Sequence, residues 1–254
     1  MAAHLAPTEP MRVGQLLARF PLKRTAILLT SALVMGTGVT LLVTAHLGLL
    51  PIDVLHRGVA TRGGFTFGGG IIGTQAILLM IAIPLRVKIG TGTVLAFLIP
   101  AMTADLLLSL VPPAQALPIR IAAFVAGGAL FCVGVAGYLT ASLGILPRDG
   151  IMLVLGRNRP RHIAAARIAI DAVFVLVGGL LLGPADAIRH GDIGIGTVVL
   201  ALTGGPAIAA ALPLTARILR EPVPTRGPRI ATGAPADAPP RKPGAHRRTR
   251  KATR

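Results

Sequence analysis

The sequence predicts an all-α membrane protein with six transmembrane helices arranged as two inverted three-helix repeats. Three observations lead to this fold class. The 254-residue chain is 53% hydrophobic and 14% charged, it contains six apolar stretches of spanning length, and a ten-residue motif recurs at an offset of 96 residues. With a mean hydropathy of +0.73, the chain has too few polar residues for a water-facing exterior. We therefore expect the lipid bilayer to be its main partner.

The six stretches follow from the thickness of the bilayer. A hydrocarbon core of about 30 Å is crossed by a helix of roughly 17 to 25 predominantly apolar residues. The stretches that fit are Ala26–Leu47, Gly69–Leu85, Thr91–Leu110, Ile121–Leu143, Ile163–Leu182 and Ile193–Leu214. They divide the chain into an N-terminal segment (1–24), a first three-helix repeat (25–117), a second three-helix repeat (118–216) and a C-terminal tail (217–254).

The basic residues orient these spans, because Lys and Arg concentrate in cytoplasmic loops. With a cytoplasmic N-terminus, the basic residues that fall outside are only Arg57, Arg62, Arg120 and Arg189. Those that fall inside near span ends are Arg12, Arg19, Lys23, Arg24, Arg86, Lys88, Arg148, Arg157, Arg159, Arg161, Arg217 and Arg220. We therefore predict a bacterial plasma-membrane protein with both termini in the cytoplasm. No small-residue cleavage site follows the first apolar run closely, which indicates a retained signal anchor.

The tail after Glu221 is rich in Pro, Gly, Ala, Thr and Arg, which predicts a disordered segment. Its basic residues could attract anionic lipid headgroups, at about 1 kcal/mol per residue near the surface. Alternatively, they only fix the topology or aid solubility. The net charge of +17 is not accompanied by interleaved aromatic residues, since the chain has no Trp and one Tyr. We therefore expect no nucleic-acid partner, and the sequence leaves the oligomeric state open.

An internal repeat is the most informative feature of the chain. The segment TAHLGLLPID at Thr44–Asp53 matches TASLGILPRD at Thr140–Asp149 in seven of ten positions. A second match relates Ile89–Thr93 to Ile193–Thr197. Each half has three spans, an odd number, so the second half must be inverted relative to the first. Inverted repeats recur in secondary transporters, whose substrate sites lie between the halves at Gly- or Pro-interrupted helices.

The repeated motif has the form Gly-x-x-Pro-x-Asp. Glycine can end one helix and proline can begin the next. Two interpretations follow: a broken helix that offers a carboxylate to a cation or polar substrate, or a helix cap at a turn on the membrane surface. The motif residues are Gly48, Pro51 and Asp53 in the first half and Gly144, Pro147 and Asp149 in the second.

The second repeated element is Gly-x-Gly-Thr. It resembles half of a phosphate loop but lacks the preceding strand and the remaining spacing, so nucleotide binding is rejected. Small residues at a helix start favour close packing between membrane helices. The residues are Gly90, Gly92 and Thr93 in the first half and Gly194, Gly196 and Thr197 in the second. The inverted arrangement predicts that Asp53 shares one membrane face with Gly194–Thr197, and Asp149 the other with Gly90–Thr93.

A few polar residues fall within the predicted spans, where an unpaired charge costs several kcal/mol. They include Asp105, Arg167 and Asp171. Arg167 and Asp171 are four residues apart on one helix face, which predicts an intrahelical ion pair. At the repeat offset Asp171 corresponds to Gln75, so these two are expected to meet near the axis that relates the halves. Asp53, Asp149, Asp171, Gln75, Arg167 and Asp105 are the candidate substrate-binding or ion-binding residues.

We expect no enzymatic activity, no cofactor and no metal site. The sequence has no His-Glu-x-x-His motif, and it offers neither the Ser/His nor the paired-Asp arrangement of an intramembrane protease. Cys132 is the only cysteine, which excludes an internal disulfide and a cysteine-based zinc cluster.

At these motifs the chain resembles the bacterial YczE/YyaS/YitT-type integral membrane proteins. The recurring segments of that family are matched by Gly48–Asp53, by Pro147–Gly150 and by the two Gly-x-Gly-Thr elements, within residues 24–214. The chain departs from the family pattern at Ile52, where the family often has Trp, and at Ala96, where it often has Asn. The resemblance implies the membrane fold and assigns no catalytic residue.

Two functions are compatible with the sequence. The first is a transporter that moves or binds a small molecule or ion between the inverted repeats. The second is a non-transporting membrane scaffold or regulatory protein, in which the glycine-rich helix surfaces pack against partner helices and the acidic residues are structural.

Overall fold

The computed structural model describes residues 22–85, 87, 90–156 and 160–221, and these residues form helices and connecting turns without a strand. The helices are α2 (Leu22–Ala45), α3 (Pro51–Gly63), α4 (Phe67–Ala82), α5 (Thr91–Leu110), α6 (Leu117–Ala141), α7 (Pro147–Leu155), α8 (Pro160–Leu182), α9 (Pro184–Arg189) and α10 (Ile195–Leu219). Five of them, α2, α5, α6, α8 and α10, are long and apolar enough to cross a membrane. The prediction of an all-helical membrane protein with about six spans is therefore confirmed.

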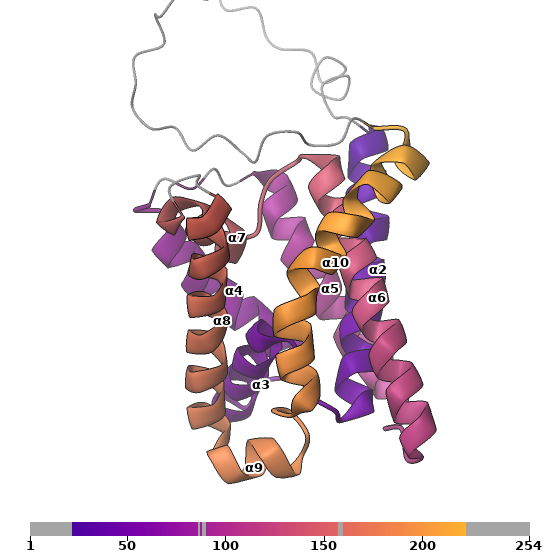
Figure 1. The fold of residues 1–254 in the computed structure, drawn as a ribbon, viewed down its shortest axis with the longest axis vertical. Coiled ribbons are helices and arrows are strands. Elements are labelled where there is room, and N and C mark those ends of the chain that lie inside the picture. The colour runs from indigo at the N-terminus through magenta and orange to yellow at the C-terminus, as the bar shows by residue number, and fades with distance from the viewer. Residues whose placement is uncertain (1–21, 86, 88–89, 157–159, 222–254) are drawn as a thin grey trace, which may run out of the picture.

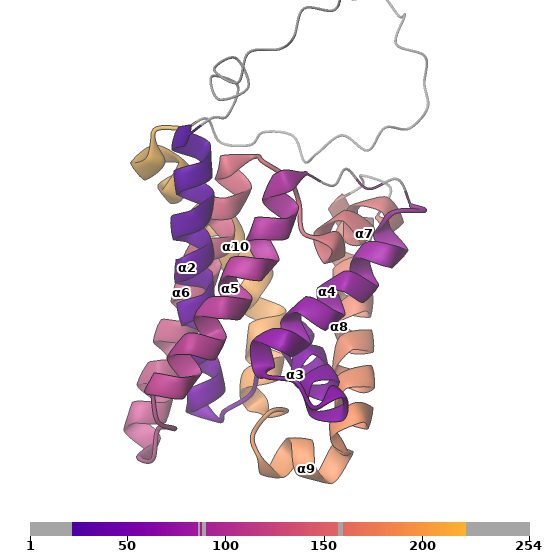
Figure 2. The same ribbon diagram turned by 180° about the vertical axis from the view of Figure 1, so that it is seen from behind.

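The long helices run alternately up and down the bundle (Figures 1 and 2). In these views α2, α5 and α8 descend from the end at which the described chain begins, and α4, α6 and α10 run back toward it. The short helices do not span the bundle: α3 lies in its lower half, α7 in its upper half, and α9 along its lower end. At the upper end the Lys23 ammonium lies 2.8 Å from the Glu221 carboxylate, so the two ends of the described chain meet there.

The second predicted span, Gly69–Leu85, differs most from the structure. Helix α4 has 16 residues, and it is bent by 107° relative to α3 at the break between them, as in a broken span or a re-entrant loop. Gly64 causes the break, because its left-handed φ of 66° ends α3. Thr66 then caps α4 by accepting a hydrogen bond from the Gly69 N–H at 3.0 Å. Most of the segment between the first and second predicted spans is therefore a 13-residue helix.

Helices α2 and α6 pack together along one side of the bundle (Figures 1 and 2), and glycines permit their close approach. A side chain added at Gly38 would clash with the backbone of Gly127 and Phe131, and one added at Gly134 would clash with the backbone of Ser31 and Met35. Glycine is the common means by which membrane helices bring their backbones together. Next to this pair, α5 packs on α2 and α10 on α6, whereas α3 packs on α8 and α7 on α4.

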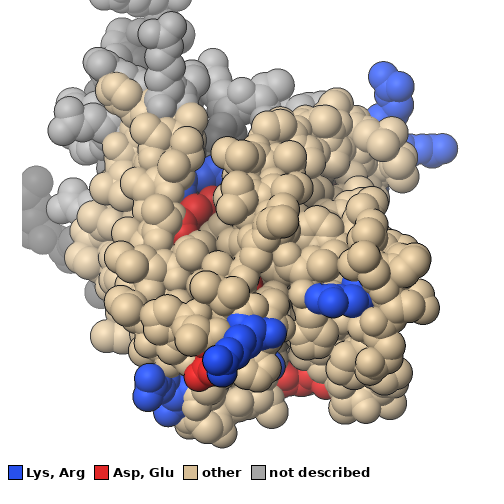
Figure 3. All heavy atoms as spheres, turned by 60° about the horizontal axis from the view of Figure 1, so that its bottom comes forward, with Lys and Arg blue, Asp and Glu red and all other residues tan. Residues whose placement is uncertain are grey.

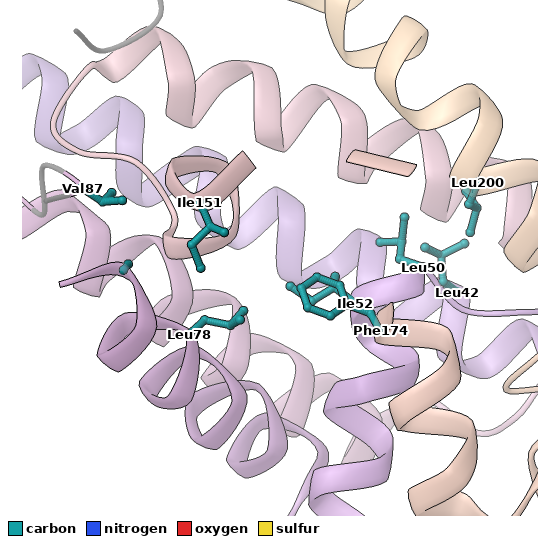
Figure 4. Packing of buried hydrophobic residues seen from close by; sticks show 9 residues of the cluster. Leu42, Leu50, Ile52, Leu78, Val87, Ile151, Phe174 and Leu200 are labelled. Atoms are coloured by element: carbon teal, nitrogen blue, oxygen red, sulfur yellow. The ribbon is translucent and has the colours of Figure 1, made fainter. Parts of the chain in front are cut away.

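One apolar cluster joins most of these elements (Figure 4). Its buried side chains come from both halves of the chain: Leu42, Leu50, Ile52, Leu78, Ala82, Val87, Ile151, Phe174 and Leu200. The outer surface is also apolar, with exposed side chains such as Ile77, Met80, Leu106, Val125 and Leu202. Figure 3 shows a largely uncharged face, on which the few charged groups form small clusters. An exterior of this kind fits lipid and not water.

Candidate functional site

A small cavity lies between six helical elements, among them α2 and α6. Its volume is about 50 Å³, which is enough for a few water molecules or one small solute. Its polar side chains are those of Asp53, His56, Gln75, Arg148 and Asp149. The apolar lining residues are Met35, Val39, Ile52, Ile71, Ala96, Phe97, Pro100, Phe131, Val135 and Leu146.

The repeated Gly-x-x-Pro-x-Asp motifs bring two of these carboxylates to the cavity. Gly48 and Gly144 adopt φ values of 126° and 155°, which turn the chain after α2 and α6. Pro51 and Pro147 then begin α3 and α7, where proline is well tolerated. Asp53 and Asp149 consequently lie in the first turns of the two short helices and face the same cavity.

Each Gly-x-x-Pro-x-Asp motif packs against the Gly-x-Gly-Thr element that is more distant in the sequence. On the Asp53 side, the Gly196 N–H donates a hydrogen bond of 2.9 Å to the Leu47 carbonyl. On the Asp149 side, the Thr93 hydroxyl donates one of 3.0 Å to the Ile145 carbonyl. Thr93 and Thr197 also accept bonds from the N–H groups of Gly90 and Gly194, at 3.1 and 3.3 Å. The glycine-threonine elements thus fix the turns that position the carboxylates.

Asp53 and His56 form a buried pair on α3. Their side chains are 3% and 5% exposed, and His56 Nδ1 lies 2.9 Å from Asp53 Oδ1. The other two atoms, Asp53 Oδ2 and His56 Nε2, have no hydrogen-bond partner among the described residues. The Asp53 carboxylate does not cap its own helix in the described structure, so the surface-turn interpretation does not account for it.

Gln75 adds a third unpartnered group to the cavity. It lies on α4, its side chain is 4% exposed, and its amide oxygen has no partner in the described part of the chain. A buried polar atom left without a hydrogen bond costs about 1–3 kcal/mol. Such atoms are rare in native structures, and several in one cavity indicate a place for water or a ligand.

Arg148 links the cavity to a chain of charges of alternating sign. Its Nε lies 3.4 Å from Asp149 Oδ1, and its Nη1 lies 3.7 Å from Asp171 Oδ1. Asp171 Oδ2 lies in turn 3.8 Å from Arg167 Nε, which is the ion pair expected from their spacing. The Tyr138 hydroxyl donates a hydrogen bond to the other oxygen of Asp149. Two arginines and two aspartates therefore compensate one another in this network.

Asp171 lines a second space, a groove, and not the central cavity. This groove of about 460 Å³ lies between α8 and α10, and its lining is apolar apart from Asp171 and Thr197. Gln75 and Asp171, which the repeat offset predicts to meet, thus line separate spaces. The reason is that Arg148 of α7 lies between them: it lines the cavity with Gln75, and its guanidinium reaches Asp171.

Asp105, another candidate binding residue, is placed elsewhere. Its carboxylate accepts a hydrogen bond of 2.6 Å from the Thr66 hydroxyl and one of 2.7 Å from the Gly68 N–H. These contacts hold the start of α4 against α5, and Asp105 is not among the residues that line the central cavity. The structure therefore gives it a capping contact.

Sequence reasoning missed three residues of the site: His56, Arg148 and Tyr138. The spacing of Asp53 and His56 by three residues on a helix was a usable signal, because such residues share one face. Arg148 was assigned to the cytoplasmic end of a span, whereas its side chain is only 15% exposed and lies at the cavity. No group of three or more potential metal ligands occurs in the part of the chain that the structure describes.

Comparison with known proteins places this architecture among bacterial membrane proteins. The chain is 30% identical over 196 residues to an uncharacterized protein of Haemophilus influenzae, covering 77% of this chain and 86% of that one. It is 29% identical over 190 residues to the uncharacterized protein YyaS of Bacillus subtilis, covering 73% and 90%. It is 23% identical over 205 residues to the uncharacterized membrane protein YczE of the same organism, covering 80% and 92%. No solved structure matches the chain.

These relatives confirm the resemblance to YczE-type proteins that the two motifs indicate. Ile52 and Ala96, the positions at which the chain departs from the pattern of those proteins, both line the central cavity. A family model described as "Family of unknown function (DUF6198)" matches residues 22–213, which include every residue of the site. The protein therefore belongs to this family of YczE-type membrane proteins.

Proposed function

We propose that this protein is a transporter that moves a small solute across the membrane through the central cavity. The observation that carries the proposal is the set of unpartnered polar atoms on Asp53, His56 and Gln75, buried inside a bundle of membrane helices. Placing polar groups inside a membrane bundle costs free energy, and such groups are typical of substrate and ion pathways. None of the polar groups at the cavity forms a catalytic triad or a metal centre, so binding and passage, without catalysis, account for them best.

We infer an inverted repeat, which supports this proposal. If α2–α5 and α6–α10 are taken as the two halves, the helices that correspond between them run in opposite directions in Figures 1 and 2. The left-handed turns at His46 and Ser142 and the turns at Gly48 and Gly144 recur at the repeat offset of 96 residues. In this arrangement the two short helices, α3 and α7, enter from opposite ends and direct their first turns at one site. Secondary transporters use that geometry to expose a site alternately to the two sides of the membrane.

The transport proposal predicts that Asp53→Asn abolishes the uptake of at least one solute. Purified protein in proteoliposomes is given a panel of amines, amino acids, sugars and carboxylates, and the internal solutes are measured by mass spectrometry. Asp186→Asn is the matched control, because Asp186 is exposed on α9 far from the cavity. If no solute enters with the wild type in excess of empty liposomes, or if folded Asp53→Asn retains full uptake, the proposal is wrong.

We also propose that both ends of the chain face the cytoplasm of a bacterial cell and that the membrane is the plasma membrane. The basic residues Lys23, Arg24, Arg217 and Arg220 belong to the end at which α2 begins and α10 ends. Reporter fusions test this: a fusion at Val111, between α5 and α6, is expected to read outside, and one after Glu221 is expected to read inside. The reverse pattern would overturn the orientation.

A further inference from the structure

When Asp53 is ionised and His56 is neutral, the three unpartnered atoms in the central cavity share one chemical property: all of them accept hydrogen bonds. An ionised carboxylate can only accept, so in its pair with Asp53 the Nδ1 atom of His56 is the donor. In the neutral ring the remaining nitrogen, Nε2, is then an acceptor. The free atoms are therefore a carboxylate oxygen of Asp53, a ring nitrogen of His56 and the amide oxygen of Gln75. A ligand that satisfies them must bring N–H or O–H donors.

The charges around the cavity favour a cation. Arg148 is the basic residue that lines the cavity, and its guanidinium is already shared between Asp149 and Asp171. The Asp171 carboxylate is also paired with Arg167, so these four charges balance. The contact of Asp53 in the described structure is the His56 imidazole, and when that ring is neutral Asp53 is left as a buried negative charge. A buried charge without an opposite charge is strongly unfavourable, and a bound cation would compensate it.

The walls of the cavity distinguish among cations. Most lining residues are apolar, and two of them, Phe97 and Phe131, are aromatic. Aromatic faces attract cations, and apolar walls hold alkyl groups. A bare metal ion would instead require a shell of oxygen ligands. The volume of about 50 Å³ limits the ligand to a few non-hydrogen atoms.

We propose that the central cavity binds a small primary alkylammonium ion. Its ammonium group donates hydrogen bonds to the free atoms of Asp53, His56 and Gln75, and its alkyl group lies against the apolar wall. This inference rests on the proposed function, since it names the class of solute for the same site.

Equilibrium binding to the purified full-length protein in lipid nanodiscs tests the proposal. Ethylammonium is compared with ethanol, which lacks the charge, with tetramethylammonium, which lacks N–H donors, and with sodium ion. Ethylammonium is expected to bind more tightly than each of the others by about tenfold or more, because it alone combines a positive charge with N–H donors, and hydrogen bonds between charged groups are the strong ones. Equal binding of ethanol or tetramethylammonium, or displacement of ethylammonium by an equal concentration of sodium, overturns the proposal.

Two variants locate the binding site. Asp53→Asn is expected to weaken ethylammonium binding by about tenfold or more, and Gln75→Leu by a smaller factor, since one loses a charge and the other a neutral acceptor. Asp186→Asn is expected to bind like the wild type. Unchanged binding in folded Gln75→Leu and Asp53→Asn places the ligand elsewhere and contradicts the inference.

The experiments distinguish failure of the binding proposal from failure of the transport proposal. If ethylammonium does not bind but an Asp53-dependent solute is found in the proteoliposome panel, the class of solute is wrong and the transport proposal stands. If ethylammonium binds at Asp53 but no solute crosses the bilayer, the site stands and the transport proposal is wrong.

Discussion

Gly48→Ala is expected to lower the free energy of unfolding by at least about 3 kcal/mol, the upper part of the range for a residue forced into a disfavoured backbone conformation. Gly48 has a φ of 126°, which side-chain-bearing residues rarely adopt. In addition, a Cβ atom at this position would overlap the backbone nitrogen of Thr197, at the start of α10. Backbone cannot move aside as a flexible side chain can, so strain and overlap act together.

Substitutions at two other glycines, Gly64 and Gly73, distinguish the effect of backbone strain from that of steric overlap. Gly64 also has a left-handed φ, of 66°, but a Cβ atom there meets nothing within 4 Å, so Gly64→Ala is expected to cost only about 1–2 kcal/mol. Gly73 lies inside α4, and a Cβ atom there would contact Val59 Cγ1 at 3.4 Å. Gly73→Ala is therefore expected to be neutral or stabilising, by up to about 1 kcal/mol. Unfolding of the purified variants in mixed micelles measures all three.

The comparison tests how the two halves are held together. The turn at Gly48 precedes Asp53 by five residues and rests on α10 of the other half. If Gly48→Ala costs no more than Gly64→Ala, the contact with Thr197 is looser than the structure indicates. The turn then does not determine where the carboxylate lies.

The sequence is informative where the local chemistry is strong. The bounds of the third span, Thr91–Leu110, agree with α5 because Gly90 and Thr93 define the start of the helix. The repeated motif likewise identifies Asp53 and Asp149, and the correspondence with Asp171 at the repeat offset identifies Gln75.

Hydropathy alone does not identify helix α3 and its histidine as part of the bundle, for a physical reason. Its sequence, PIDVLHRGVATRG, contains one aspartate, one histidine and two arginines, so it reads as a loop outside the membrane. Its position inside the bundle depends on packing against α8, where Gly178 lets the backbone of Leu55 approach closely. That contact joins residues more than one hundred positions apart, so no local sequence pattern predicts it. Arg148 was misplaced for the same reason, because the folding back of α7 buries it.

Arg148→Met is expected to destabilise the protein by about 3 kcal/mol, because removing one partner of a buried ion pair leaves the other charges uncompensated. The guanidinium contacts both Asp149 and Asp171, which face different spaces. After the substitution Asp149 keeps the Tyr138 hydroxyl and Asp171 keeps Arg167, so the cost falls at the lower end of the range for such losses. Arg189→Met, at an exposed arginine on α9, is the matched control and is expected to change little.

Removing the opposing charge distinguishes charge balance from simple packing. If the network is held by compensation, Asp149→Asn combined with Arg148→Met restores at least half of the lost stability, since a neutral amide tolerates burial better than an unpaired carboxylate and Asp171 keeps its pair with Arg167. If the loss reflects only the missing bulk of the arginine stem, the two substitutions are additive, and the double variant is less stable than either single one. Unfolding of the four proteins in one detergent mixture decides between these outcomes. Rescue would mean that Arg148 neutralises the carboxylates between the cavity and the groove. Asp53 would then be the carboxylate that remains available to bind a cationic solute.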